Sequence, residues 1–341
     1  MFCALLFLTH HVQALENSKL DAKAKLAFGY DDNVSDRVKD VIKTRFIQFY
    51  LNSNVSIISA KRTLFSLKLQ DGLKHHDAPS LSHENILINN LNLYLSHSLD
   101  RFVPELSGEF RSRTSIHSKD NVSPSEVAYM RGYAGLALKT IISNDLSGKL
   151  FYNYRASKFE DFDLFDRKGH ELGAKIDVKL LPNSLTNLQY SREMMDFNKW
   201  NSGKIFRTDT TDVITAGFEM YNALLINANL SYEANKSSID AYSYNGYTLS
   251  VMLAKSITQN TTIEIYGLYR SRNTSASSSE FISEQMAIED EEKEIVTAKL
   301  SRDITERCAL EAQYDMRKNR SEKDIGTYIR NVFSLSVIYS F

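Results

Sequence analysis

Apolar and polar residues alternate with a period of two along most of this chain. In the segment 172–180, for example, Leu172 and Ala174 occupy one set of positions, while Lys175 and Asp177 occupy the other. Successive side chains of a β-strand point to opposite faces, so this alternation predicts strands with one apolar and one polar face. Beyond the amino-terminal segment, the chain divides into about sixteen such stretches of roughly ten to fourteen residues.

The connections between these stretches alternate between short and long. The short ones are rich in Asn, Asp, Ser and Pro, which favour turns, and fall at 59–62, 98–101, 143–145, 181–184, 221–223, 258–261 and 302–305. The longer polar ones fall at 31–44, 71–84, 114–126, 158–168, 194–209, 236–242, 271–291 and 318–326. This alternation is typical of transmembrane β-barrels, which have short periplasmic turns and long extracellular loops.

The pattern predicts an all-β fold, namely a transmembrane, antiparallel, up-and-down β-barrel of about sixteen strands that occupies residues 15–341 as one domain. Inside hydrocarbon every backbone amide needs a partner, and a sheet meets this demand only when its edges join. Counts of about fourteen or eighteen strands also fit the pattern. A soluble propeller or solenoid would have shorter strands and usually a sequence repeat, which we do not find.

Composition narrows the class of protein further. The chain has 341 residues and a formal net charge of −1, so we expect no nucleic-acid partner. It contains 18 tyrosines and 18 phenylalanines but 4 prolines, which suits long strands. After the amino-terminal segment, no run of about eighteen apolar residues occurs, so no helical membrane span is expected.

Residues 1–14 have features of a secretory signal peptide. The stretch 2–9 is a short apolar core, and Val12-Gln13-Ala14 has small residues at the spacing of a cleavage site. The usual Lys or Arg before the apolar core is missing, so the signal is either atypical or begins upstream. We expect an integral protein of the outer membrane of a Gram-negative bacterium, with both termini in the periplasm.

The polar faces of the predicted strands carry many charged side chains, which should line a wet interior. About sixteen strands leave an interior too wide for side chains to fill. The pore-lining candidates are Lys68, Arg111, Arg113, Arg131, Lys139, Lys149, Arg155, Lys175, Glu219, Glu233, Glu264, Glu311 and Asp315. Basic residues dominate the first half of the chain and acidic residues the second half, which predicts one basic wall and one partly acidic wall. Either these charges set a transverse field across the pore, or they pair and keep the lumen polar; strand register decides between the two.

Aromatic residues also occur on the apolar faces, near the expected strand ends. The candidates are Tyr30, Tyr154, Tyr190, Tyr269, Tyr339 and Phe341. Amphipathic rings favour the headgroup zone of a bilayer, so these residues are candidates for two aromatic girdles.

The carboxyl-terminal segment has apolar side chains on every odd position and ends on an aromatic residue. Its apolar residues are Phe333, Leu335, Val337, Tyr339 and Phe341. The segment resembles the carboxyl-terminal signature strand of bacterial outer-membrane proteins. That resemblance implies that these five side chains act as an assembly signal for the barrel assembly machinery.

Three stretches are similar to the β-barrel porin type 2 family of outer-membrane proteins. They are Gly29-Tyr30-Asp31-Asp32-Asn33-Val34 after the first predicted strand, Arg131-Gly132-Tyr133, and the ending at 333–341. Some members of that family are encoded with exopolysaccharide export systems. The resemblance implies a porin-like role or a role in polysaccharide export, without a defined ligand site.

We therefore expect a porin-like channel that gives small hydrophilic solutes a water-filled passage. Two alternatives are an outer-membrane barrel of an exopolysaccharide export system, and a surface-binding barrel with little transport. The expected partners are outer-membrane lipid and lipopolysaccharide, the barrel assembly machinery and, for the first alternative, polysaccharide export components.

Other candidate sites carry less weight. His75, His76 and His83 cluster with nearby aspartates, but their spacing matches no metal-coordination pattern. The acidic run 288–294 could hold a divalent cation, although such a run usually marks a hydrated loop. The pair Asp31-Asp32 could also bind Ca²⁺, although a turn cap is the more usual role of such residues. His97, His117 and His170 lack a convincing nucleophile for hydrolysis. We expect no metal, no cofactor and no enzymatic activity.

Overall fold

The computed structural model describes residues 18–34, 41–59, 62–77, 85–115, 128–159, 166–197, 207–274, 292–320 and 327–341. Its strands are β1 (Ser18–Asp31), β2 (Thr44–Ser59), β3 (Thr63–His76), β4 (Ile86–His97), β5 (Phe102–Ser115), β6 (Tyr129–Ile141), β7 (Leu146–Phe159), β8 (Arg167–Val178), β9 (Ser184–Phe197), β10 (Thr208–Tyr221), β11 (Leu225–Ser237), β12 (Tyr244–Thr258), β13 (Thr261–Thr274), β14 (Glu292–Asp303), β15 (Cys308–Arg320) and β16 (Tyr328–Ser340). A short 3-10 helix, η4 (Asp240–Tyr242), precedes β12.

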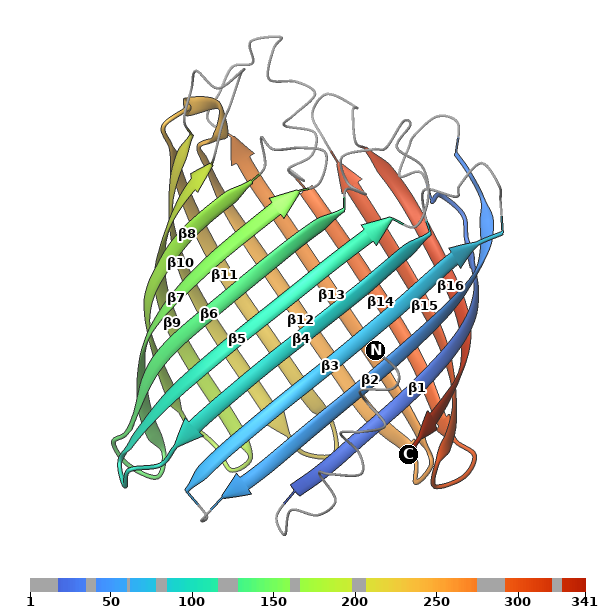
Figure 1. Ribbon diagram of the computed structural model, residues 1–341, viewed down its shortest axis with the longest axis horizontal. Helices are drawn as coiled ribbons and strands as arrows, with labels where there is room; N and C mark the ends of the chain where they lie inside the picture. The colour runs from blue at the N-terminus through green and yellow to red at the C-terminus, as the bar shows by residue number, and fades with distance from the viewer. Residues whose placement is uncertain are drawn as a thin grey trace.

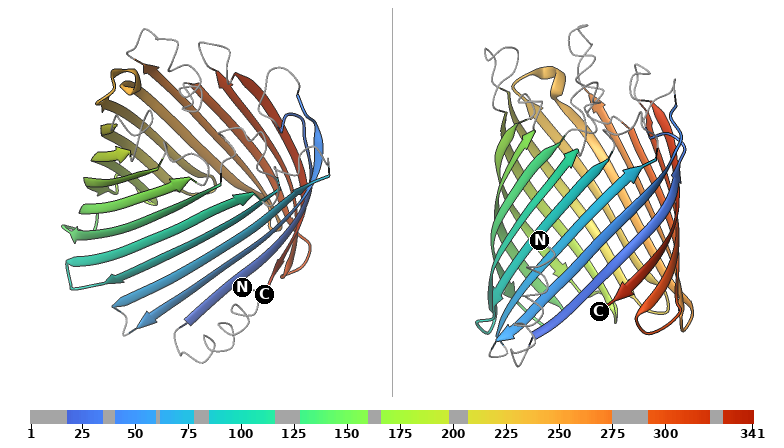
Figure 2. Two further views of the ribbon diagram at one scale, coloured as in Figure 1. Left: turned by 45° about the horizontal axis from the view of Figure 1, so that its top comes forward. Right: turned by 45° about the vertical axis from the view of Figure 1, so that its right-hand side comes forward.

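The sixteen strands form one closed barrel. Each strand pairs with its neighbours in the chain in antiparallel fashion, and β1 pairs with β16. Figures 1 and 2 show the tilted strands winding around the barrel axis. The predicted all-β, antiparallel barrel of about sixteen strands is confirmed, and closure satisfies the backbone groups that an open sheet edge would leave unpaired.

The two ends of the barrel differ in the length of their connections. At one end, here called the turn end, the strand bounds leave two to five residues between partners; at the other, the loop end, they leave six to seventeen. The last short turn is 304–307 rather than 302–305, because Asp303 still pairs with Ala309. The described chain begins with β1 and finishes at Phe341, both at the turn end (Figure 1).

Strand register places apolar side chains together on the outer surface. Phe28 lies opposite Ile47 on one side and Leu335 on the other, and all three side chains are exposed. Among the described residues, eight apolar side chains are buried, whereas forty-nine large apolar side chains are exposed. A water-soluble domain would bury this surface, so the wall is built for an apolar surrounding.

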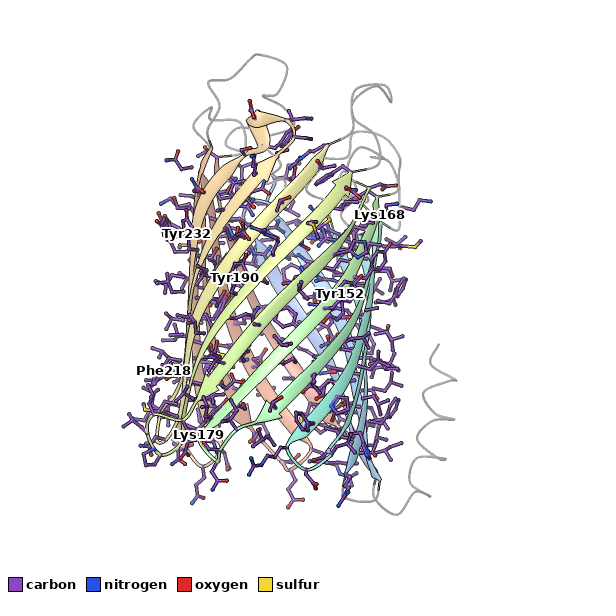
Figure 3. All side chains as sticks on the ribbon, turned by 90° about the vertical axis from the view of Figure 1, so that its left-hand side faces the viewer. Tyr152, Lys168, Lys179, Tyr190, Phe218 and Tyr232 are labelled. Atoms are coloured by element: carbon purple, nitrogen blue, oxygen red, sulfur yellow. The ribbon has the colours of Figure 1, made fainter. Side chains whose placement is uncertain are left out.

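The outer surface changes character toward the loop end. Outward side chains there are mostly polar, and this polar band includes Lys158, Lys168, Asp196, Thr208, Lys236, Asn245, Asn273 and Lys318. Below it, the outward residues form an apolar belt that extends toward the turn end. Figure 3 shows Lys168 near the loop end, Tyr190 and Tyr152 below it, and Phe218 closer to the turn end.

The six aromatic residues proposed for girdles all lie on the outer face and are exposed. Tyr190, however, is the seventh of the fourteen residues of β9, and Tyr154 and Tyr269 are also near the middle of their strands. They lie there because the strands continue past the apolar belt into the polar band. These three tyrosines therefore mark the edge of the apolar belt that faces the loop end, rather than the strand ends.

In the part of the chain that the structure describes, no helix is long and apolar enough to cross a bilayer.

Candidate functional site

The inner wall of the barrel is polar and charged, and it is the candidate site. All thirteen residues proposed as pore-lining lie on the inward-facing side of their strands by register. A cavity of about 1020 Å³ in the loop half of the lumen is lined by side chains from β5 through β14, so it spans facing walls. Eight basic and five acidic residues line it. The cavity is therefore positively charged overall.

Basic side chains are sorted by height along the lumen. Among the described strands, the inward cations of the turn half are lysines, including Lys68, Lys139, Lys149, Lys175 and Lys299. Those of the loop half are mostly arginines, namely Arg111, Arg113, Arg131, Arg155, Arg167, Arg270, Arg272, Arg317 and Arg330, together with Lys74 and Lys293. Because guanidinium forks bind planar oxyanions more specifically than ammonium groups do, the two halves differ in recognition chemistry.

Strand register assembles two basic rows on the wall formed by β5 to β8. Lys139 lies opposite Lys149, which lies opposite Lys175, and these three form a lysine row. Nearer the loop end, Arg111 lies opposite Arg131, which lies opposite Ser157, which lies opposite Arg167. We call Arg111, Arg131 and Arg167, with Ser157 between them, the arginine row. The predicted basic wall thus consists of two parallel rows.

Ion pairs neutralise much of the lumen. Lys149 contacts Glu105 at 2.6 Å, Lys25 contacts Glu311 at 2.6 Å, and Lys299 contacts Glu264 at 2.6 Å. Each pair joins inward groups from neighbouring or next-neighbouring strands. Among the described residues, most inward acidic side chains form ion pairs, whereas part of the basic wall does not. The lumen therefore combines the two arrangements that the sequence left open.

A hydrogen-bonded network occupies the middle of the basic wall. The Tyr133 hydroxyl donates to Asn153 Oδ1 at 2.8 Å, and Asn153 Nδ2 donates to Glu171 Oε2 at 2.8 Å. Arg155 Nη2 donates to the same carboxylate at 2.7 Å, and its Nη1 lies 3.4 Å from Glu193. Arg155 therefore belongs to this network and is neutralised, although it lies on the same wall as the arginine row.

The arginine row has no such partner. Among the described residues, no carboxylate forms an ion pair with Arg111, Arg131 or Arg167, and all three line the large cavity. Aromatic rings support the guanidinium groups instead: Arg131 lies 4.3 Å from the centre of the Tyr129 ring, and Arg167 lies 5.9 Å from that of Phe197. Such contacts hold a cation in place without cancelling its charge.

The β1–β16 seam carries a second cluster at the loop end. Asp31 is fully buried and accepts three hydrogen bonds from Arg330, at 3.0, 3.1 and 2.6 Å, while Lys74 lies 3.6 Å from it. Asp32 accepts hydrogen bonds from the backbone N and side-chain Nδ2 of Asn331 at 2.6 and 2.7 Å. The pair Asp31-Asp32 therefore connects the first strand to the last strand of the barrel. A turn contact also exists, because Asn33 N donates to Asp31 Oδ1 at 3.3 Å.

Other proposed sites do not converge. His75 lies on the outer face and His76 on the inner face, because they are adjacent on β3; His83 falls outside the described residues. Within the described ranges, no group of three potential ligands could hold a metal ion. Asp77 accepts hydrogen bonds from Thr44 Oγ1 and the Arg45 backbone amide, and the Thr44 bond in particular holds its pKa below the usual value.

Two further outward histidines, His97 and His170, have hydroxyl partners. His97 lies 2.8 Å from Thr63 Oγ1, and His170 lies 2.6 Å from the Tyr152 hydroxyl. His117, residues 1–14 and most of the acidic run lie outside the described residues. At the end of that run, Glu294 is an outward residue of β14 and lies 3.3 Å from Lys318.

Sequence reasoning missed several basic residues of the lumen. Arg167 and Arg207 fall in segments that the sequence pattern assigned to loops, yet Arg167 begins β8, and Arg207 lies directly before β10 and lines the cavity. Arg272, Lys74 and Lys293 lie equally close to loop-end strand termini and face inward. Alternation fades where the outer face becomes polar, so it could not locate these strand ends.

The carboxyl-terminal strand has the facing expected from its pattern. Phe333, Leu335, Val337, Tyr339 and Phe341 are all exposed on the outside, and the four within β16 lie outward by register. Phe341 N donates to the Ala22 carbonyl at 3.0 Å, so hydrogen bonding to β1 continues to the last residue.

Comparison with solved structures identifies the class of fold. OmpT of Vibrio cholerae, an outer-membrane protein, is similar to this chain with a TM-score of 0.53 and 10% identity, over 96% of this chain and 98% of that one. The fold is that of an outer-membrane β-barrel. The loop L8 deletion mutant of OmpT gives a TM-score of 0.51 and 8% identity, over 96% and 100%. CdiB from Acinetobacter baumannii has a TM-score of 0.49 and 14% identity; the match covers 93% of this chain but 60% of CdiB.

No protein-family model matches the chain, and the β-barrel porin type 2 family is therefore not confirmed. No curated protein matches it either.

Proposed function

We propose that this protein is a porin-like channel of the Gram-negative outer membrane that gives small hydrophilic solutes a water-filled passage. The observation that supports the proposal is an inner wall that carries charged side chains along its whole height, inside a barrel of sixteen strands. Barrels of this size leave an aqueous channel when their inward residues are polar. The exposed apolar belt supplies the lipid-facing surface.

The orientation follows from the two ends of the barrel. Short turns and both ends of the barrel sequence lie together, so we place them in the periplasm and the long connections outside the cell. In this proposal the barrel assembly machinery recognises the carboxyl-terminal strand, and lipopolysaccharide contacts the polar band. No catalytic step is assigned to the lumen.

Single-channel recording in planar bilayers tests the proposal. Purified, refolded protein should produce stepwise currents that persist at constant voltage, and the same sample unfolded by heat should not. A barrel that is folded by electrophoretic mobility but yields no conductance would reject the channel and point to a surface-binding barrel. Deletion of the gene with loss of secreted polysaccharide, and with unchanged uptake of small solutes, would point to an export role instead.

A further inference from the structure

The arginine row presents positive charge that forms no ion pair with any carboxylate of the described residues. Arg111 and Arg131 are directly opposite each other on β5 and β6, which places their Cβ atoms about 5 Å apart. Like charges in this position destabilise a sheet. The arrangement is therefore costly unless a negative charge compensates it.

Four of the five acidic side chains that line the cavity form ion pairs with basic groups outside the row. Of the five acidic residues that line the cavity, Glu171 and Glu193 contact Arg155, Asp209 contacts Arg207 at 2.6 Å, and Glu233 lies 3.5 Å from Arg272. Glu109, the fifth, lies opposite Tyr133 in the next row. It forms no ion pair with any basic group in the described part of the chain. An oxyanion in the lumen would thus meet guanidinium groups that have no ion pair within the described ranges.

The surroundings of the row fix the orientation of these groups. The Tyr129 ring lies 4.3 Å from the Arg131 guanidinium carbon and 6.0 Å from that of Arg111, and the Phe159 ring lies 5.7 Å from that of Arg131. A guanidinium that rests on a ring face keeps its N–H edges free for an acceptor. Arg111 and Arg131 are exposed to the lumen, and Ser157 adds a hydroxyl between Arg131 and Arg167.

We propose that the arginine row binds the carboxylate or phosphate group of an anionic organic solute. This inference rests on the proposed channel, and names the class of solute that the channel selects. Carboxylate and phosphate share the chemistry that guanidinium forks recognise, with paired oxygens that accept parallel N–H bonds. A row of three such groups offers alternative positions along the wall, so that a bound solute can move on.

Saturation-transfer-difference NMR on the refolded protein in detergent micelles measures weak binding without requiring conduction. The probes are glucuronate, glucose 6-phosphate and glucose, which share a sugar ring and differ in their charged group. We expect signals from the two anionic sugars and little from glucose. A signal from one anionic sugar alone would assign the row to that oxyanion, whereas equal signals from all three sugars would overturn the proposal.

Three variants test which residues are responsible. The triple variant Arg111→Gln, Arg131→Gln, Arg167→Gln should weaken binding about tenfold or more. The matched control Lys19→Gln, Lys23→Gln, Arg317→Gln removes the same number of inward charges outside the row, and should bind as the native protein does. In the variant Arg111→Lys, Arg131→Lys, Arg167→Lys, charge is kept but the forks are lost, so binding should also fall. Native-like binding by either row variant would overturn the proposal.

The two proposals fail separately. Binding without bilayer conductance would reject the channel and keep the site, and conductance without binding of either anionic sugar would reject the site and keep the channel. Electrophoretic mobility of unheated samples shows that each variant is folded. Removing adjacent like charges relieves repulsion, so we expect the glutamine variant of the row to fold at least as well as the native chain.

Discussion

Adjacent residues of this wall meet opposite environments. Leu93 lies opposite Leu67 and Gly108 on the outer face, while Asn92 lies opposite Lys68 and Glu109 on the inner face. One position along the chain therefore separates a lipid-facing site from a water-facing one.

Substitution by arginine at these two positions should have different effects. Leu93→Arg places a charge in the apolar belt, which costs about 2–4 kcal/mol near the bilayer midplane. Asn92→Arg adds a charge to an already polar wall and should fold normally. Folding into lipid vesicles, followed by the mobility shift of unheated protein on gels, measures both. Equal folded fractions would contradict the facing of β4.

The sequence shows on which face of the sheet each residue lies, but it does not show how neighbouring strands are aligned. A strand that slides by two positions keeps every side chain on its face, so Arg111 and Arg131 could have been two residues apart along the wall without any change in the pattern. Their convergence depends on the pairing of β5 with β6. The charge of the wall was therefore predictable, whereas the arginine row was not.

At the scale of elements, several inward aromatic rings lie opposite glycines on the neighbouring strand. Phe46 lies opposite Gly29, Tyr50 opposite Gly72, and Phe151 opposite Gly173. A Cβ at each glycine would overlap the ring, which shows that each ring occupies the space beside its glycine. These pairs keep bulky side chains against the wall and leave the lumen open.

Filling one of these positions should narrow the passage. Gly173→Leu would displace the Phe151 ring from the wall toward the lumen and lower single-channel conductance. Gly267 makes a suitable control, because it faces outward on β13 and a Cβ there would meet nothing within 4 Å. Gly267→Leu should therefore conduct as the native protein does. Unchanged conductance in folded Gly173→Leu would show that this ring does not limit the passage.

Strands were also harder to recognise where they leave the apolar belt. β3 carries Asp71 on its outer face, β9 carries Arg192, and β13 carries Asn273. Arg192 donates two hydrogen bonds to Asp212, at 2.8 and 2.9 Å, on the outside of the barrel. In these stretches both faces are polar, so alternation is lost although the strand continues.

At the scale of the whole molecule, closure depends on the pairing of the first strand with the last. β1 and β16 pair over nine residues, whereas every other pair of adjacent strands pairs over eleven to fourteen. The Asp31 cluster lies at the loop end of this short seam and ties β16 and β3 to β1. The buried carboxylate thus compensates two cations at once.

Neutralising this carboxylate should destabilise the barrel. Asp31→Asn removes the buried carboxylate charge that Arg330 and Lys74 contact, and breaking a buried ion pair in this way costs about 3–5 kcal/mol. Urea unfolding in lipid vesicles, followed by tryptophan fluorescence, measures the change. Asp315→Asn is the control, because Asp315 accepts hydrogen bonds from Thr297 and Gln313 and forms no ion pair within the described chain; it should cost about 1 kcal/mol or less. Equal losses would exclude a special role for the seam cluster.

The polar band on the outside also indicates the height, across the bilayer, of the Arg167 end of the arginine row. Arg167 begins β8, beside the outward Lys168, so this end of the row lies at the height of the polar band. The electric potential across a bilayer falls mainly through its hydrocarbon, where each elementary charge gains or loses about 2.3 kcal/mol per 100 mV. A solute held at Arg167 has yet to enter that layer. Its capture there would therefore be nearly independent of voltage, and Arg167 would bind the solute before the solute enters the hydrocarbon layer.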